Sequence, residues 1–196
     1  MSYYNFAELG DLERTLFTQK HYPCVFISHK KEDEVAAIAI GNYLINTVGI
    51  NIYLDTQDCT LKETVSSEND QRIVKSIQKG LTCSSHLLCL VSDKTKLSWW
   101  VPYEIGFADK QGIDIAALKL KDVDDIPSYL KIKKALFNTK DFLQYISELG
   151  PYGAIMAKEN YIRFSACDNS VLAEYIDWLG ENKNVWLLYS TSQGFH

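Results

Sequence analysis

The chain has 196 residues, of which 46% are hydrophobic and 12% aromatic, so it can bury one substantial core. Its net charge of −5 argues against a broad nucleic-acid surface, because such a surface needs clustered Lys and Arg. No apolar run approaches the roughly 20 residues that span a bilayer, which argues against a membrane protein.

Two further features of the sequence bear on compartment and metals. Residues 1–5 are polar and lack the layout of a signal peptide, so we expect a cytoplasmic protein. The five cysteines are odd in number and contain no Cys-x-x-Cys pair. They therefore predict buried thiols rather than a disulfide framework or a zinc site, and we expect no bound metal.

The predicted elements alternate between short apolar strands and helices. Strands are expected at residues 24–28, 51–55, 86–92, 114–120 and 135–138. Helices are expected at residues 6–17, 33–48, 67–80, from 98 onward, 141–149 and 169–179. Gly49 and Gly80 are predicted to end two of these helices, and Ser67–Asp70 resembles a capping box. This alternation indicates an α/β protein with parallel crossover connections.

The alternating region, residues 22–149, is predicted to form one open parallel sheet with helices on both faces. Residues 1–21 then form a helical extension. Residues 150–196, which include an apolar run at 185–189, form an α/β extension. Because this extension is too short to bury much core alone, we expect it to pack on the main domain. Its large rings are predicted to be core residues: Tyr161, Trp178 and Trp186.

The segment Ser98–Phe107 places a carboxylate among aromatic rings near the start of a helix. Ser98 is the predicted N-cap, and Pro102 suits the first turn. Glu104 follows near the N-terminus, where the helix dipole favours a negative charge. Three rings fall on its side of the helix: Trp100, Tyr103 and Phe107. Only one of the two adjacent tryptophans can face a cleft, and we expect Trp99 to lie in the core.

Ligands of open parallel sheets bind beyond the carboxyl ends of the strands. Polar residues follow three of the predicted strands: Ser28, His29, Asp55 and Ser92. Glu104 opens the helix after the third strand and belongs to the same edge. Phe26, in the first strand, is a further candidate for substrate binding. The loops carry neither G-x-G-x-x-G nor a phosphate-binding P-loop motif, so a conventional dinucleotide fold is not indicated.

Each candidate also has a purely structural interpretation. His29 either contacts a substrate phosphate or ribose, or lies on the surface. Asp55 either hydrogen-bonds a ribose or caps its loop. Ser28 and Ser92 are of a type that often satisfies turn backbone. Glu104 could serve only as a favourable charge near the helix N-terminus.

Three stretches in order resemble the Toll/interleukin-1 receptor (TIR) domain family, over about residues 22–147. Residues 25–33, Val-Phe-Ile-Ser-His-Lys-Lys-Glu-Asp, resemble the first-strand box of plant and bacterial members. Residues 73–92 resemble the helix and strand that follow. The pattern Ser98-x-Trp100-x-x-x-Glu104-Ile105 resembles the family's serine, tryptophan and glutamate signature. The resemblance implies a flavodoxin-like open parallel sheet of about five strands.

The resemblance also implies an activity. Enzymatic TIR domains cleave NAD between nicotinamide and ribose, and the glutamate of the third stretch is their catalytic acid, which places this role on Glu104. NAD is then the substrate, and no cofactor is expected. Trp100 or Tyr103 would pack against a base, and the remaining polar candidates would bind substrate. If water is excluded and another group of the same molecule attacks the ribose, the product is a cyclic ADP-ribose.

Departures from the family refine this hypothesis. The segment 56–65 lacks the Pro-Gly element of receptor and adaptor members, which argues against an adaptor-type contact. A small TIR domain with flanking extensions looks most like the NAD-consuming signal generators of bacterial antiphage systems such as Thoeris, whose cyclic product activates a separate effector. The family also implies assembly into a homo-oligomer through TIR–TIR contacts.

The sequence is also compatible with three other functions. The first is an interaction module without enzymatic activity. The second is plain NAD depletion, with linear ADP-ribose as the product. The third is an activity like that of nucleoside deoxyribosyltransferases, which use a carboxylate on a related sheet but act on nucleosides.

Overall fold

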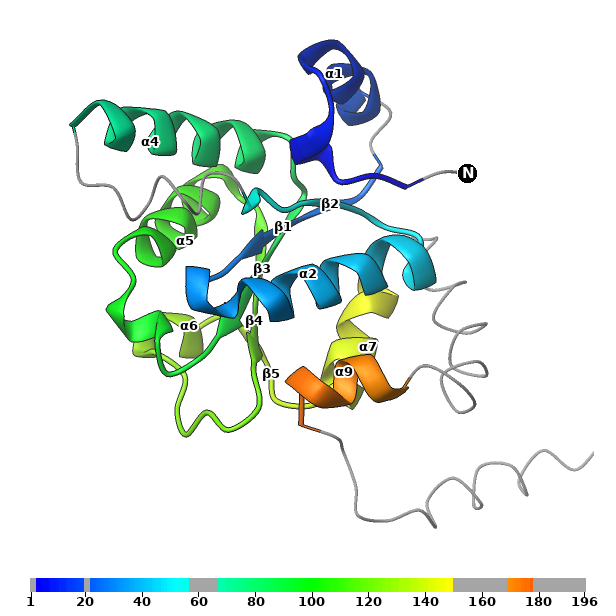
Figure 1. The fold of residues 1–196 in the computed structure, drawn as a ribbon, viewed down its shortest axis with the longest axis vertical. Coiled ribbons are helices and arrows are strands. Elements are labelled where there is room, and N and C mark those ends of the chain that lie inside the picture. Colours follow the sequence, from blue (N-terminus) through cyan, green and yellow to red (C-terminus); the bar gives the residue numbers. More distant parts are fainter. Residues whose placement is uncertain (1–2, 20–21, 57–66, 150–168, 178–196) are drawn as a thin grey trace, which may run out of the picture.

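The computed structural model describes residues 3–19, 22–56, 67–149 and 169–177 (Figure 1). A five-stranded parallel sheet lies at its centre, with strand order β2-β1-β3-β4-β5. The strands are β1 (Cys24–Ser28), β2 (Asn51–Tyr53), β3 (His86–Val91), β4 (Asp114–Lys119) and β5 (Lys134–Leu136). This is the flavodoxin-like order, so both the predicted α/β class and the predicted strand number are confirmed.

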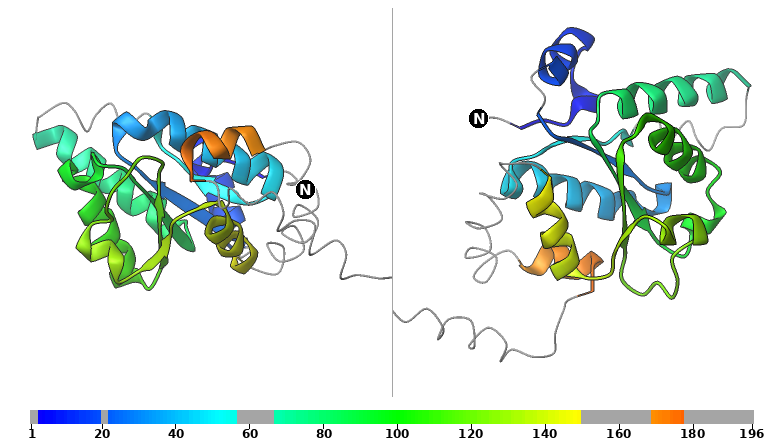
Figure 2. Two further views of the ribbon diagram at one scale, coloured as in Figure 1. Left: turned by 90° about the horizontal axis from the view of Figure 1, so that it is seen from below. Right: turned by 180° about the vertical axis from the view of Figure 1, so that it is seen from behind.

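Helices cover both faces of the sheet. One face carries α4 (Ser67–Thr82), α5 (Trp100–Gln111) and the short α6 (Ser128–Lys131). The other carries α2 (Glu34–Tyr43), α7 (Thr139–Glu148) and α9 (Asn169–Tyr175), as the two further views show (Figure 2). The central strand β3 is apolar after His86, and its residues from Leu87 to Val91 are fully buried, as expected of a strand covered on both faces.

The helix predicted at 33–48 is built from three pieces. It begins as the 3₁₀ turn η2 (Lys31–Asp33), continues as α2 and ends as the π-helical η3 (Leu44–Val48). Gly49 follows with φ of 76° and ends the helix as predicted, because glycine adopts the left-handed conformation without steric cost.

The helix predicted at 6–17 is interrupted. The structure has a 3₁₀ turn, η1 (Phe6–Glu8), and then α1 (Asp11–Gln19), with Leu9 in an extended conformation between them. The chain before η1 is part of the sheet edge, since Tyr4 accepts a backbone hydrogen bond from Ile52 at 3.1 Å. The fully buried Phe6 anchors this segment in the core.

The prediction that Gly80 ends a helix is wrong. Helix α4 continues to Thr82. A Cβ atom at Gly80 would lie 2.5 Å from the Tyr53 ring and 2.8 Å from the Phe26 ring. Gly80 therefore lets the last turn of α4 approach two aromatic side chains closely, and it has no role as a stop signal.

Helix α9 shows how the C-terminal extension joins the domain. It packs on α2, and the side chains of Leu172 and of Ile176, the residue after the helix, are fully buried. Asp177 accepts a hydrogen bond from Lys119 Nζ at 2.9 Å, which ties the end of α9 to β4. Several predictions fall outside the described residues: those on the segment 56–65 beyond Thr56, on the apolar run 185–189, and on the rings Tyr161, Trp178 and Trp186. In the described part of the chain, no helix has the length and apolarity to cross a membrane.

Candidate active site

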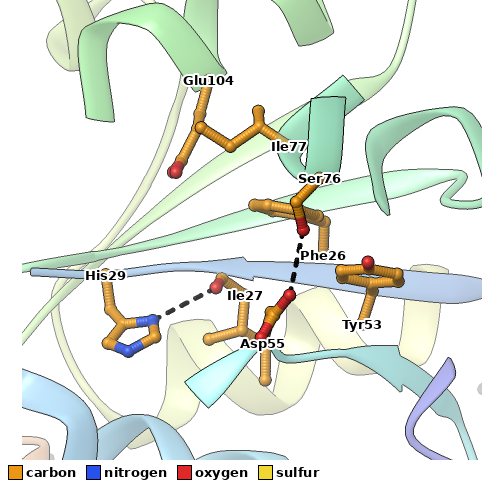
Figure 3. Close-up of a pocket in the computed structure, with 8 residues that line it drawn as sticks. All are labelled: Phe26, Ile27, His29, Tyr53, Asp55, Ser76, Ile77 and Glu104. Atoms are coloured by element: carbon orange, nitrogen blue, oxygen red, sulfur yellow. Dashed lines mark hydrogen bonds between the residues drawn. The ribbon is translucent and has the colours of Figure 1, made fainter. Parts of the chain in front are cut away.

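The strand order locates the site. Between β1 and β3 the chain leaves the sheet in opposite directions, so a crevice forms beyond the carboxyl ends of these two strands. A pocket of about 320 Å³, including its part open to solvent, lies there (Figure 3). Its lining residues are Phe26, Ile27, His29, Tyr53, Asp55, Ser76, Ile77 and Glu104.

Glu104 is the most buried carboxylate of this pocket, with 1% of its surface exposed. The hydroxyl of Ser28, at the end of β1, donates a hydrogen bond of 2.5 Å to its Oε2. Ser98 caps α5 as predicted, because its Oγ accepts from the Val101 N–H at 3.2 Å. Glu104 begins the second turn of the helix, where the dipole is weaker than in the first turn. The Ser28 hydroxyl is therefore a contact that positions this carboxylate.

Aromatic rings form one wall of the pocket. Phe26 of β1 and Tyr53 of β2 stack with centroids 5.6 Å apart and planes 10° apart. Ile77 of α4 also lines the pocket. The close approach at Gly80, one turn after Ser76, keeps α4 against these rings. This wall is apolar and limits the access of water to Glu104.

Two further polar side chains line the pocket. Ser76 Oγ donates a 3.0 Å hydrogen bond to Asp55 Oδ2, which joins α4 to the segment after β2. His29 is 6% exposed, and its Nδ1 lies 3.3 Å from the Ile27 carbonyl oxygen. His29 is thus a buried residue of the pocket, and its alternative interpretation as a surface histidine is wrong.

The structure does not bring Ser92 into this lining. Its hydroxyl donates a 2.5 Å hydrogen bond to Asp33 Oδ2 and accepts one from the Lys94 N–H at 3.2 Å. Ser92 therefore fastens the loop after β3 to η2, which follows β1. This is the structural role that serines often have in turns.

The aromatic residues Trp100, Tyr103 and Phe107 of α5 are not among the residues that line the pocket. Tyr103 accepts a hydrogen bond from Gln78 Nε2 of α4 at 2.9 Å and contacts Trp100 edge to face. Phe107 stacks on Tyr103 at 6.4 Å. Trp100 and Tyr103 thus form a row against α4, whereas Glu104 turns toward β1. The prediction that Trp99 is a core residue is wrong, since 90% of it is exposed.

Sequence reasoning missed four pocket residues, Ile27, Tyr53, Ser76 and Ile77. Ile77 and Gly80 lie on the apolar side of the predicted helix, and this face does indicate contact with the sheet. Ser76, directly before Ile77, carries no distinguishing pattern. Tyr53 lies in a strand whose residues are buried on both sides, so alternation does not tell which face it takes.

The two buried thiols of the sheet, Cys24 and Cys89, are not nucleophiles. Cys89 lies beside Ser28 in the parallel register of β1 and β3. Burial raises the pKa of its thiol far above the ordinary value, and the negative charge of Glu104 raises it further. Burial likewise raises the pKa of Cys24 to about 12. Both thiols therefore stay protonated at neutral pH. Among the described residues, no group of three or more His, Cys, Asp or Glu is arranged to hold a metal ion.

Comparison with protein families adds to this geometry. Residues 26–125 match the family model described as "Thoeris protein ThsB, TIR-like domain". The matched span is just over half of the chain and contains every residue that lines the pocket. A search of curated proteins found no match.

Proposed function

This chain belongs to the TIR-like domain family of the Thoeris protein ThsB and so supplies a TIR module for antiphage defence; on that premise, we propose that it cleaves the bond between nicotinamide and ribose in NAD. Glu104 is the catalytic carboxylate in this proposal. The observation that carries it is the buried Glu104–Ser28 pair, which lies at the switch point of the sheet and faces a pocket with apolar walls.

One carboxylate is enough for this bond. The pyridinium ring of NAD is already cationic, so it leaves as neutral nicotinamide when the electron pair of the C1′–N bond returns to the ring. No general acid is needed, unlike in ordinary glycoside hydrolysis. The ribosyl group gains oxocarbenium character as the bond breaks, and the carboxylate of Glu104 stabilises this developing positive charge.

Ser28 and the apolar wall prepare Glu104 for this step. The Ser28 hydroxyl holds one carboxylate oxygen in place, so little reorganisation is required when the charge develops. Phe26, Tyr53 and Ile77 reduce the polarity around the carboxylate, and in such surroundings its interaction with a cation is stronger than in water.

The same wall favours a cyclic product. Once nicotinamide has left, C1′ is captured either by water, which gives ADP-ribose and a proton, or by a hydroxyl or ring nitrogen of the same molecule. A site with limited water favours the intramolecular attack when the nucleophile is held close. We propose a cyclic ADP-ribose as the main product. A separate effector would sense it, and assembly of several copies would promote its formation.

The test is the product pattern of the purified full chain. We expect incubation with NAD, followed by chromatography and mass spectrometry, to show nicotinamide and a cyclic ADP-ribose. Linear ADP-ribose alone would indicate NAD depletion. Cleavage of nucleosides with NAD left intact would indicate a deoxyribosyltransferase-like activity. Intact NAD under conditions that promote assembly would leave the interaction module as the function and contradict the proposal.

A further inference from the structure

We propose that Asp55, positioned by Ser76, makes this pocket select NAD, whose base carries a neutral carboxamide, over the dinucleotide whose base is nicotinic acid. The inference rests on the proposed NAD cleavage and adds a determinant of base selectivity. Asp55 would act on substrate binding, and Ser76 would be its positioning residue.

The charges of the pocket support this selectivity. Two of its eight lining residues are carboxylates, Glu104 and Asp55, and none of the lining residues in the described chain is Lys or Arg. They come from different elements, and in Figure 3 Glu104 extends from α5 on one side of β1 while Asp55 lies beyond the end of β2. A cationic pyridinium bound between them is attracted by both. A carboxylate added to the base removes this attraction and faces like charges.

The contact with α4 fixes where Asp55 lies. Ser76 Oγ donates to Asp55 Oδ2 at 3.0 Å, and Asp55 itself is only half-buried. Ser76 and Gly80 are one turn apart on the same face of α4. Because Gly80 contacts the Phe26 and Tyr53 rings, the depth of α4 over the sheet is set by close packing. The Ser76 hydroxyl is therefore held over Asp55 by the same packing that forms the aromatic wall.

The position of Glu104 determines which part of the dinucleotide lies in the pocket. Glu104 lines the pocket, and in the proposed reaction it must lie at the scissile ribose. The nicotinamide riboside half then occupies the pocket, with its flat ring against Phe26. A carboxamide N–H is a donor and suits a carboxylate acceptor, whereas a nicotinic acid carboxylate has no donor to offer.

The experiment compares kcat/KM of the full chain on NAD and on nicotinic acid adenine dinucleotide. We expect the wild type to prefer NAD by about 10- to 100-fold, since an unpaired like charge in a pocket is strongly rejected. Asp55→Asn should bring the ratio toward one, mainly by raising KM for NAD and lowering it for the acid. Ser76→Ala should give an intermediate ratio, and Ser76→Thr, which keeps the hydroxyl, should restore the wild-type ratio.

Matched controls separate this effect from general ones. Thr82→Ala removes an exposed α4 hydroxyl that bonds the Gln78 carbonyl, and Asp125→Asn removes an exposed carboxylate paired with Lys131. Both should keep the wild-type ratio. A measurement without variants is product inhibition of the wild type, which nicotinamide should cause and nicotinic acid at equal concentration should not.

The outcomes are distinct. Equal cleavage of the two dinucleotides by the wild type, or an unchanged preference in Asp55→Asn, would overturn the inference while leaving NAD cleavage intact. Cleavage of neither dinucleotide would overturn the proposed function, and the base selectivity with it.

Discussion

Two hydroxyl–carboxylate pairs cross the switch point of the sheet in opposite directions. Ser28 at the end of β1 bonds Glu104 of α5, which follows β3, and Ser92 after β3 bonds Asp33 of η2, which follows β1. Both hydrogen bonds measure 2.5 Å, yet only Glu104 lines the pocket. In the proposed function the same chemistry serves two purposes, one catalytic and one structural, and they differ in whether the carboxylate lines the pocket.

The largest expected effect breaks one pair at its carboxylate. Glu104→Gln keeps the shape of the side chain and removes the charge, so kcat for nicotinamide release should fall about 10²- to 10³-fold. Asp33→Asn makes the same change in the other pair and should leave kcat near that of the wild type. Steady-state kinetics on both variants check this, with circular dichroism to confirm folding. Similar losses in the two variants would contradict the assigned roles.

The next comparison removes each hydroxyl. Ser28→Ala should lower kcat about tenfold, the equivalent of one lost hydrogen bond worth about 1.4 kcal/mol. Ser92→Ala should mainly lower thermal stability, by about 2–4 °C for each kcal/mol lost in a chain of this size. Kinetics and thermal melting of both variants form the test. The comparison fails if Ser92→Ala is the variant with the larger loss of kcat.

A third prediction concerns the aromatic wall of Phe26 and Tyr53, which lines the pocket together with Glu104. Gly80→Ala places a Cβ within 2.5 Å of the Tyr53 ring, so the unfolding free energy should fall by about 1–3 kcal/mol. Gly106→Ala is the matched control, because a Cβ there meets nothing within 4 Å and alanine is the better helix former. Denaturant titration should show opposite signs for the two variants. A stabilised Gly80→Ala variant would mean that α4 does not depend on close packing.

The smallest expected effect lies at the amino ends of the strands, opposite the pocket. Burial lowers the pKa of His86, at the start of β3, below its ordinary 6.5, although the Asp114 charge opposes the shift. The unfolded chain then binds this proton more readily than the folded one, so stability should fall as pH drops below about 6.5. Melting temperatures of the wild type should show this loss, and those of His86→Gln should show less of it. Equal pH profiles would exclude His86 as the cause.

The sequence contains most of the fold. Runs such as residues 86–91 can be placed as central strands because a strand covered on both faces is apolar throughout. Gly49 and Gly80 show the limit, since the sequence does not tell that Gly49 takes a left-handed φ of 76° and ends its helix whereas Gly80 stays helical against two rings. Only the tertiary arrangement shows that Tyr53 and Phe26 lie beneath Gly80.

The site was predictable only in part, because the strand order follows from the sequence and the packing of the helices does not. Topology alone brings Glu104 and Ser28 together. Ser28 ends β1, Glu104 lies in the helix after β3, and these two strands are neighbours in the sheet. The rotation of α5 about its axis does not follow from periodicity. It places Trp99 in solvent and directs Tyr103 to Gln78 rather than to the pocket. The role of Ser76 is not visible in the sequence, because its hydrogen-bond partner Asp55 lies 21 residues earlier.

The central claim is that Glu104 acts on the C1′–N bond of bound NAD, and one sample of Glu104→Gln can separate binding from cleavage. Calorimetric titration of that variant with NAD, followed by chromatography of the same mixture, measures both. We expect Glu104→Gln to bind NAD about as tightly as the wild type and to release almost no nicotinamide. Nicotinamide released at the wild-type rate would contradict it.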